Sequence, residues 1–270
     1  MILEKLAEST RVRIAQQMKE HSFEEVRSKA ELLAAREMEV QEYDYPFEEA
    51  LSKPGLSIIS EVKKASPSKG VIAEDFPYIE IAKEYERGGA DAISCLTEPS
   101  KFHGEDKYLS DIVKNVNIPV LRKDFTVDPY MIYQAKNLGA SAILLIAAIL
   151  SDEELKNYFE IADTLGMSCI FEAHDAEEVK RSLAAGARIL GVNNRNLKDF
   201  TVDINNSIRL REMVPSDIIF VSESGIMVPE DVKQLRENGT DAVLIGEMLM
   251  RSSDKASLIK ELKSNPEKEQ

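Results

Sequence analysis

The sequence predicts an α/β fold in which eight parallel strands, each followed by a helix, close into a (β/α)8 TIM barrel behind an N-terminal helical extension. Short apolar runs rich in Ile and Val recur between residues 57 and 246. Amphipathic segments of about ten to fifteen residues separate these runs, as in βαβ units. Several of the helical segments end in a glycine followed by a small residue, which indicates a repeated unit.

Residues 1–45 are predicted to form the helical extension. Apolar residues recur there at helical spacing among Lys, Arg and Glu, for example at Val12 and Ala15. Pro46, Pro54 and Gly55 then end the pattern. We expect the extension to cover one end of the barrel.

The predicted strands are the apolar runs themselves. They cover residues 57–62, 92–96, 118–121, 142–147, 168–172, 189–193, 218–222 and 242–245. Strands that are apolar throughout must be covered on both faces, and closing the sheet into a barrel does this while removing both edges. A doubly wound open sheet is the weaker alternative because no G-x-G-x-x-G follows the first run. We predict one domain over residues 1–270, with barrel elements at 57–250 and a C-terminal helix and tail at 254–270.

Composition excludes several classes of function. The net charge of -14 argues against nucleic-acid partners and anionic membranes, because it repels phosphate polymers. Cys95 and Cys169 lie in apolar runs without metal-ligand spacing, so we predict neither a disulfide framework nor a metal site. Neither a signal-like stretch nor an apolar run of about 18 residues is present, and we expect a cytoplasmic protein.

Polar residues follow five of the predicted strands where each strand ends. Reactive groups of such barrels gather at the carboxyl ends of the strands, so these residues are candidates for one site. They are Glu61, Lys63, Lys123, Asp124, Glu172, Asn193, Arg195, Glu223 and Ser224. One such residue could simply close a layer of the core, but their convergence favours a functional site.

A phosphate site is predicted at the last two strands. Ser224 and Gly225 follow the seventh strand, and Gly246 and Glu247 follow the eighth. Many barrels bind phosphate with these two loops, where glycine lets backbone amides approach the dianion. A Ser-Gly pair is weak evidence in isolation, because turns use it widely.

The residues also resemble a known family. The segment at 59–70, ISEVKKASPSKG, is similar to the signature of indole-3-glycerol-phosphate synthases. The resemblance continues in order through 96–99 (LTEP), 122–125 (RKDF), 144–150 (LLIAAIL), 191–197 (GVNNRNL), 222–226 (SESGI) and 244–246 (LIG). It covers the whole barrel, and the family also carries a helical extension.

The resemblance implies a carboxy-lyase of tryptophan biosynthesis that closes the indole ring of an anionic carboxyphenylamino deoxyribulose phosphate, without metal or organic cofactor. It implies that Lys123 acts as a general acid, Glu172 as a second acid or base, and Lys63 with Glu61 in ring closure and dehydration. The residues implied to bind the rest of the substrate are Asn193, Arg195, Glu223, Phe102 and Leu197. Those implied to bind phosphate are Ser66, Ser224, Gly225, Gly246 and Glu247.

Departures and rival functions accompany this prediction. Lys101 and Glu105 differ from what the family suggests in the loop after the second strand, which puts the fit of the substrate there in question. We interpret His174, beside Glu172, as an ordinary loop residue. Another phosphosugar isomerase, an aldolase, or a non-catalytic phosphate-binding barrel would share the phosphate site. None of these alternatives requires Lys63, Lys123 and Glu172 together.

Overall fold

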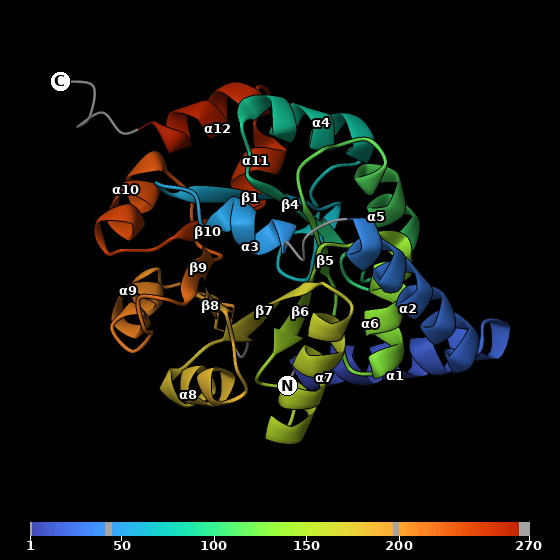
Figure 1. Cartoon of the computed structure of the whole chain (residues 1–270). Coiled ribbons are helices and arrows are strands. Elements are labelled where there is room, and N and C mark those ends of the chain that lie inside the picture. The colour runs from blue at the N-terminus through green and yellow to red at the C-terminus, as the bar shows by residue number, and fades with distance from the viewer. Residues whose placement is uncertain (1, 41–44, 197–199, 265–270) are drawn as a thin grey trace.

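A closed parallel barrel is the centre of the molecule (Figure 1). The computed structural model describes residues 2–40, 45–196 and 200–264. The barrel strands are β1 (Ser57–Val62), β4 (Ala92–Leu96), β5 (Val120–Lys123), β6 (Ala142–Ile146), β7 (Ser168–Ala173), β8 (Ile189–Asn193), β9 (Ile219–Glu223) and β10 (Ala242–Ile245). Each strand pairs in parallel with its neighbours, and β10 closes the sheet against β1. The predicted fold class is confirmed.

Helices surround the barrel and cover its ends. They are α1 (Ile2–Glu20), α2 (Phe23–Val40), α3 (Pro46–Leu51), α4 (Tyr78–Gly88), α5 (Asp106–Val113), α6 (Pro129–Leu138), α7 (Asp152–Thr164), α8 (Ala176–Ala184), α9 (Asn205–Arg211), α10 (Pro229–Glu237), α11 (Glu247–Arg251) and α12 (Lys255–Lys263). α4 and α6 end at Gly89 and Gly139, whose φ angles of 91° and 88° lie in the left-handed region. The predicted glycine pairs therefore mark helix ends at these two positions.

The third predicted strand was misplaced by two residues. The sequence predicted 118–121, whereas β5 covers Val120–Lys123. Pro119 has no N–H to donate to a ladder, although its carbonyl accepts from Ile93 N–H at 3.0 Å. The polar residues Arg122 and Lys123 interrupted the apolar run and hid the true end of the strand.

The extension and the short helix that follows it cover both ends of the barrel and one side of it. α3 lies across the amino ends of the strands (Figure 1), where Phe47 is fully buried against the barrel interior. α2 packs along α6, and Asn137 Nδ2 donates to the carbonyl of Val26 at 2.8 Å. Leu3 and Leu6 of α1 line the cavity at the opposite, carboxyl end.

A short hairpin follows β1 that the sequence analysis did not predict. β2 (Ala65–Ser66) and β3 (Gly70–Val71) pair antiparallel, and Gly70 adopts a φ of 66°. The intervening Pro, Ser and Lys are turn-compatible residues, so the signal for a tight turn was present in the sequence. The hairpin extends the chain over the carboxyl end of the barrel.

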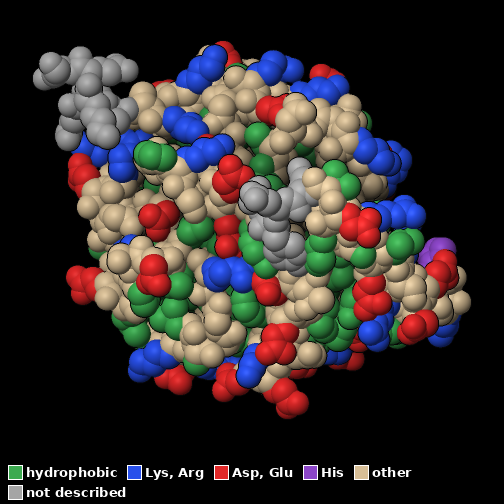
Figure 2. Space-filling view, viewed as in Figure 1, with side chains coloured by type: hydrophobic (Ala, Val, Ile, Leu, Met, Phe, Trp, Pro, Cys, Tyr) green, Lys and Arg blue, Asp and Glu red, His purple; other side chains and the backbone are tan. Residues whose placement is uncertain are grey.

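One face of the molecule shows how its charged side chains are distributed. Acidic and basic side chains are intermingled on the face shown in Figure 2, and no single basic area dominates it. Among the described helices, none is both long and apolar enough to cross a membrane.

A buried ion pair fastens α1 to the barrel. Arg13 Nη2 donates to both oxygens of Asp124, at 2.9 and 2.8 Å, and Asp124 also accepts from Thr97 Oγ1 at 2.7 Å. The Asp124 side chain is 1% exposed, so it depends on these donors instead of water.

Replacing Arg13 with Met is expected to lower the free energy of unfolding by about 2 kcal/mol, because a buried carboxylate loses a charged donor. Urea unfolding monitored by circular dichroism measures this change. Arg11→Met on the same helix is the control, since the Arg11–Glu8 pair is 44% and 71% exposed and is worth well under ~1 kcal/mol. Equal effects of the two substitutions would contradict the anchoring role of Arg13.

Candidate active site

One cavity of about 660 Å³ opens at the carboxyl ends of the strands. The predicted site residues that the structure describes all line it, and they are Glu61, Lys63, Ser66, Phe102, Lys123, Glu172, Asn193, Arg195, Glu223, Ser224, Gly225, Gly246 and Glu247. Leu197 lies outside the described residues. The barrel thus brings together residues that are up to 186 positions apart in the chain, from Glu61 to Glu247.

Four charged side chains form one layer of the barrel interior. Glu61, Lys123, Glu172 and Glu223 come from β1, β5, β7 and β9, which are alternate strands of the closed sheet. The side chains two positions earlier point the same way along each strand. Those side chains are the buried apolar Ile59, Leu121, Ile170 and Val221. The cavity floor is therefore an ionic layer that rests directly on an apolar one.

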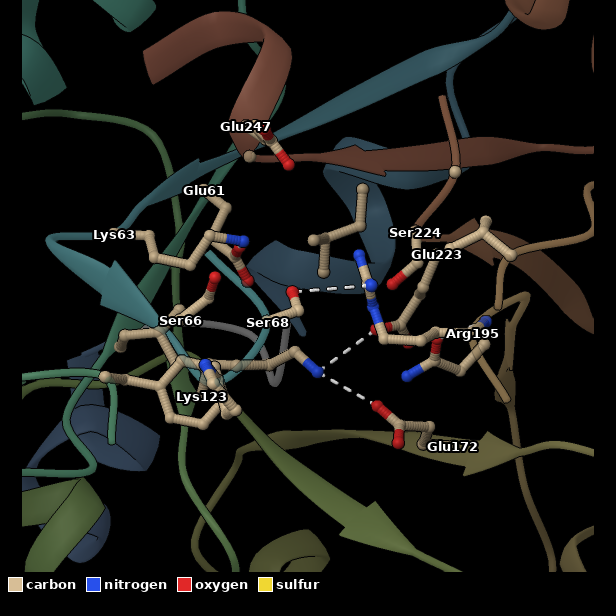
Figure 3. Close-up of a pocket in the computed structure, with 18 of the residues that line it drawn as sticks. Glu61, Lys63, Ser66, Ser68, Lys123, Glu172, Arg195, Glu223, Ser224 and Glu247 are labelled. Atoms are coloured by element: carbon tan, nitrogen blue, oxygen red, sulfur yellow. Dashed lines mark hydrogen bonds and ion pairs between the residues drawn. The ribbon is translucent and has the colours of Figure 1, made fainter. Parts of the chain in front are cut away.

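Lys123 lies between two carboxylates (Figure 3). Its Nζ is 2.9 Å from Glu172 Oε2 and 3.1 Å from Glu223 Oε2. Burial alone would lower the pKa of Lys123, but the charges of Glu172 and Glu223 outweigh burial and raise it well above its usual value. Lys123 is therefore a cation at neutral pH, placed to donate a hydrogen bond to a developing oxyanion.

The two carboxylates beside Lys123 differ in their pKa values. Burial raises the pKa of both, but Lys123 and His174 reverse this for Glu172, whose pKa falls below its usual value. For Glu223, burial and repulsion from Glu172 exceed the attraction of Lys123 and raise the pKa to about 7. Two acids with pKa values pushed apart are typical of acid–base catalysis.

Lys63 and Glu61 form a second ion pair at the upper left of the cavity in Figure 3. They are two positions apart at the end of β1, so their side chains leave the strand on the same side. Gly246 makes room for the pair, because a Cβ there would lie 2.8 Å from Lys63 Nζ and closer still to Glu61 Oε1. A side chain at position 246 would therefore force the Glu61–Lys63 pair to move.

The loop after β9 has an unusual backbone conformation. Ser224 and Gly225 adopt φ angles of 66° and 83°, a left-handed conformation that is uncommon for serine. Such strained residues cluster at functional sites. The Glu247 carboxylate pairs instead with Lys69 at 3.6 Å and Arg251 at 3.0 Å, so only its backbone amide is suited to a phosphate.

The hairpin after β1 forms part of the cavity wall. Ser68 Oγ lies 3.5 Å from Arg195 Nη1, a contact that joins the hairpin to the loop after β8. Ser68, Phe125 and the α1 residues Leu3 and Leu6 line the cavity but were not predicted as site residues. Ser68 and Phe125 lie in segments that resemble the family, so the sequence held a signal for them. The helical spacing of apolar residues in α1 did not indicate that Leu3 and Leu6 reach the cavity.

A buried glutamate shapes the loop that carries Phe102. Glu98 Oε1 accepts from the N–H and the hydroxyl of Ser100, at 2.8 and 2.5 Å. Its Oε2 accepts from Lys101 N–H and Phe102 N–H at 2.8 and 3.1 Å. Phe102 then lies 6.4 Å from the Phe125 ring, measured between centroids. The two rings form an aromatic wall of the cavity.

The departures at Lys101 and Glu105 lie outside the cavity. Both side chains are exposed, and neither residue lines the cavity wall. Glu105 accepts a hydrogen bond from the Tyr108 hydroxyl at 2.8 Å and begins α5. Neither side chain therefore shapes the cavity wall directly.

Comparison with known proteins identifies the family. A sequence model described as indole-3-glycerol phosphate synthase matches residues 3–262. The chain belongs to this family. The indole-3-glycerol phosphate synthase of Ruminiclostridium cellulolyticum is 56% identical over 265 residues, which are 98% of this chain and 100% of that protein. That of Lacticaseibacillus paracasei is 51% identical over 259 residues, covering 96% and 97% of the two chains. The predicted family, a lyase of tryptophan biosynthesis, is confirmed.

Solved structures support the fold alone. A 3-hexulose-6-phosphate synthase from Salmonella typhimurium superposes with a TM-score of 0.64 at 14% identity, covering 77% of this chain and 97% of that one. A thiamine phosphate pyrophosphorylase from Pyrococcus furiosus gives 0.60 at 17% identity, covering 77% of this chain and 93% of that one. At sequence identities this low, the superpositions support a shared barrel fold and say nothing about function.

Glu98→Gln is expected to raise KM about fivefold and to destabilise the fold by about 1–3 kcal/mol, because an amide cannot accept at both ends of the side chain. Steady-state kinetics and thermal unfolding measure the two effects. Glu105→Gln is the control, since this exposed carboxylate begins the next helix and does not reach Phe102. A KM equal to that of the unchanged protein would refute the role given to Glu98.

Proposed function

We propose that the chain closes the indole ring of 1-(2-carboxyphenylamino)-1-deoxyribulose 5-phosphate, with loss of carbon dioxide and water. The observation that carries the proposal is the ionic layer, which sets a cationic lysine between an ionised carboxylate and one that titrates near pH 7. The reaction needs an acid at a carbonyl, an acid at a hydroxyl and a base.

The substrate is proposed to lie across the cavity with its phosphate at the loops after β9 and β10. Ser66, Ser224 and the amides of Gly225, Gly246 and Glu247 would bind the dianion there. Arg195 and Asn193 would hold the anthranilate carboxylate and neighbouring polar atoms on the β8 side. The Phe102 ring, with Phe125 beyond it, would stack on the aromatic ring.

Lys123 is proposed to protonate the ketone oxygen while the ring carbon that bears the carboxylate attacks the carbonyl carbon. The carbon–carboxylate bond then breaks, and its electrons restore the aromatic ring as carbon dioxide leaves. Regained aromaticity takes the place of an electron sink, so we propose that no metal or organic cofactor takes part. The Lys123 side chain is only 13% exposed and its two partners are buried, which strengthens the interaction with the developing oxyanion.

Dehydration completes the indole. We propose that Lys63, paired with Glu61, protonates the departing hydroxyl while Glu172 removes a proton from the adjacent methylene carbon. The lowered pKa of Glu172 keeps the carboxylate ionised over the neutral range, so that it has a free lone pair to accept the proton. Glu223 is proposed to bind substrate polar atoms beside Lys123, where its pKa of about 7 lets it donate or accept a hydrogen bond.

We further propose that residues 1–270 act as one domain, because α1 of the extension supplies part of the cavity wall. An anionic phosphorylated small molecule is the partner that the cavity suits. The cytoplasmic location and the lack of nucleic-acid partners stay predictions from composition.

Lys123→Ala is expected to reduce the rate of indole product formation by at least about 10²-fold, because both the acid and the charge at the carbonyl are lost. Fluorescence of the indole product in a steady-state assay measures the rate. Lys156→Ala, at a side chain that is 69% exposed on α7, is the control and is expected to leave the rate unchanged.

The same assay tests the cofactor proposal. Treatment of the unchanged protein with a chelator is expected to leave the rate as it was. Loss of activity that zinc restores would contradict a mechanism without metal.

Ser224→Asp is expected to raise KM at least about tenfold, because a carboxylate would repel the substrate phosphate. Ser224→Asn is the matched control, since Asn and Asp both tolerate the left-handed backbone seen at this position. Equal KM values for the two variants would place the phosphate elsewhere.

A further inference from the structure

His174 lies directly after β7, in the loop that leads to α8. The sequence analysis interpreted it as an ordinary loop residue, yet its side chain is only 15% exposed. One edge of the imidazole faces the cavity carboxylate Glu172, and the other faces Glu178 in the first turn of α8. The ring therefore stands between a proposed catalytic residue and a residue outside the cavity lining.

Glu178 fixes the orientation of the ring. Its Oε2 lies 3.0 Å from His174 Nδ1 and accepts from the backbone N–H of the same histidine at 2.8 Å. His174 Nε2 is buried and has no hydrogen-bond partner within the part of the chain that the structure describes. It lies 3.5 Å from Glu172 Oε1, just beyond the usual hydrogen-bond length.

We propose that His174 is a positioning residue for Glu172. As an imidazolium held by Glu178, it attracts Oε1 of Glu172 while Lys123 binds Oε2, so the carboxylate stays ionised and fixed in orientation. The inference deepens the proposed function, because it rests on Glu172 as the base of the dehydration step. A carboxylate attracted by a cation at each oxygen is restrained from rotating away from the substrate proton.

The surrounding charges support a cationic ring. Burial alone would lower the pKa of His174, but Glu178, Glu172 and Glu223 outweigh it and raise that pKa above its usual value. These carboxylates come from α8, β7 and β9. Protonation of His174 in turn favours the ionised form of Glu172, and removing that positive charge would raise the pKa of Glu172.

A purely structural role is the competing explanation. Asp175 is the N-cap residue of α8, and its side chain accepts from the N–H groups of Glu177 and Glu178. The Glu178 side chain in turn accepts from the backbone N–H of His174. This capping arrangement uses only the backbone of residue 174. A side-chain substitution at 174 therefore keeps the cap and separates the two explanations.

His174→Gln tests the proposal in the indole-forming assay. We expect kcat at pH 7 to fall about tenfold and the acidic limb of the kcat–pH profile to move up by about one pH unit. KM is expected to stay within about twofold, and the thermal midpoint is expected to be unchanged. An unshifted acidic limb in an active variant would overturn the inference while leaving the proposed function intact. Failure of the unchanged protein to form product would instead remove the proposed function.

Imidazole titration by NMR tests the same contact without turnover. The chain has 3 histidines, so the variant identifies the His174 signal by its loss. Glu172→Gln and Glu178→Gln are each expected to lower the pKa of His174 by about one unit. Glu177→Gln removes the same charge from the same turn at a side chain that is 75% exposed, and we expect no shift. Equal shifts in all three variants, or none, would overturn the proposal.

Discussion

A lysine buried between two glutamates is the interaction on which the site depends. Isolated charges in a protein interior cost several kcal/mol each, so Lys123, Glu172 and Glu223 can be buried only together. Burial of Glu223 and its repulsion by Glu172 outweigh the attraction of Lys123, and the raised pKa of Glu223 relieves this excess of negative charge. Because the buried charges must compensate one another, Glu223 is the group of the site that exchanges a proton near neutral pH.

The barrel supplies the geometry that this interaction needs. Parallel strands in fixed register place the ends of β5, β7 and β9 on one rim, with Lys123, Glu172 and Glu223 facing inward. Glycines then make the space. A Cβ at Gly191 would lie 2.9 Å from Ile170 Cγ2 and closer still to Glu223 Oε1, just as one at Gly246 would meet the Glu61–Lys63 pair. Small residues between the charged ones are therefore as necessary as the charges.

Much of this arrangement could be predicted from the sequence, since five of the eight apolar runs end in residues that an apolar core does not explain. The reactive residues were found because they follow the strands directly. Features that depend on contacts between distant segments were missed. Ser68 reaches the cavity only because the hairpin turns over it, and Leu3 does so only because Arg13 fastens α1 to Asp124. His174 looked ordinary because its partners Glu172 and Glu178 become significant only when the ring is buried between them.

The cavity wall runs from Leu3 to Glu247, and β1 is closed by β10, the last strand to be made. A chain cut before Ala242 would therefore lack both the strand that closes the barrel and the Gly246–Glu247 part of the cavity wall. Closing the barrel and completing the cavity are one and the same event.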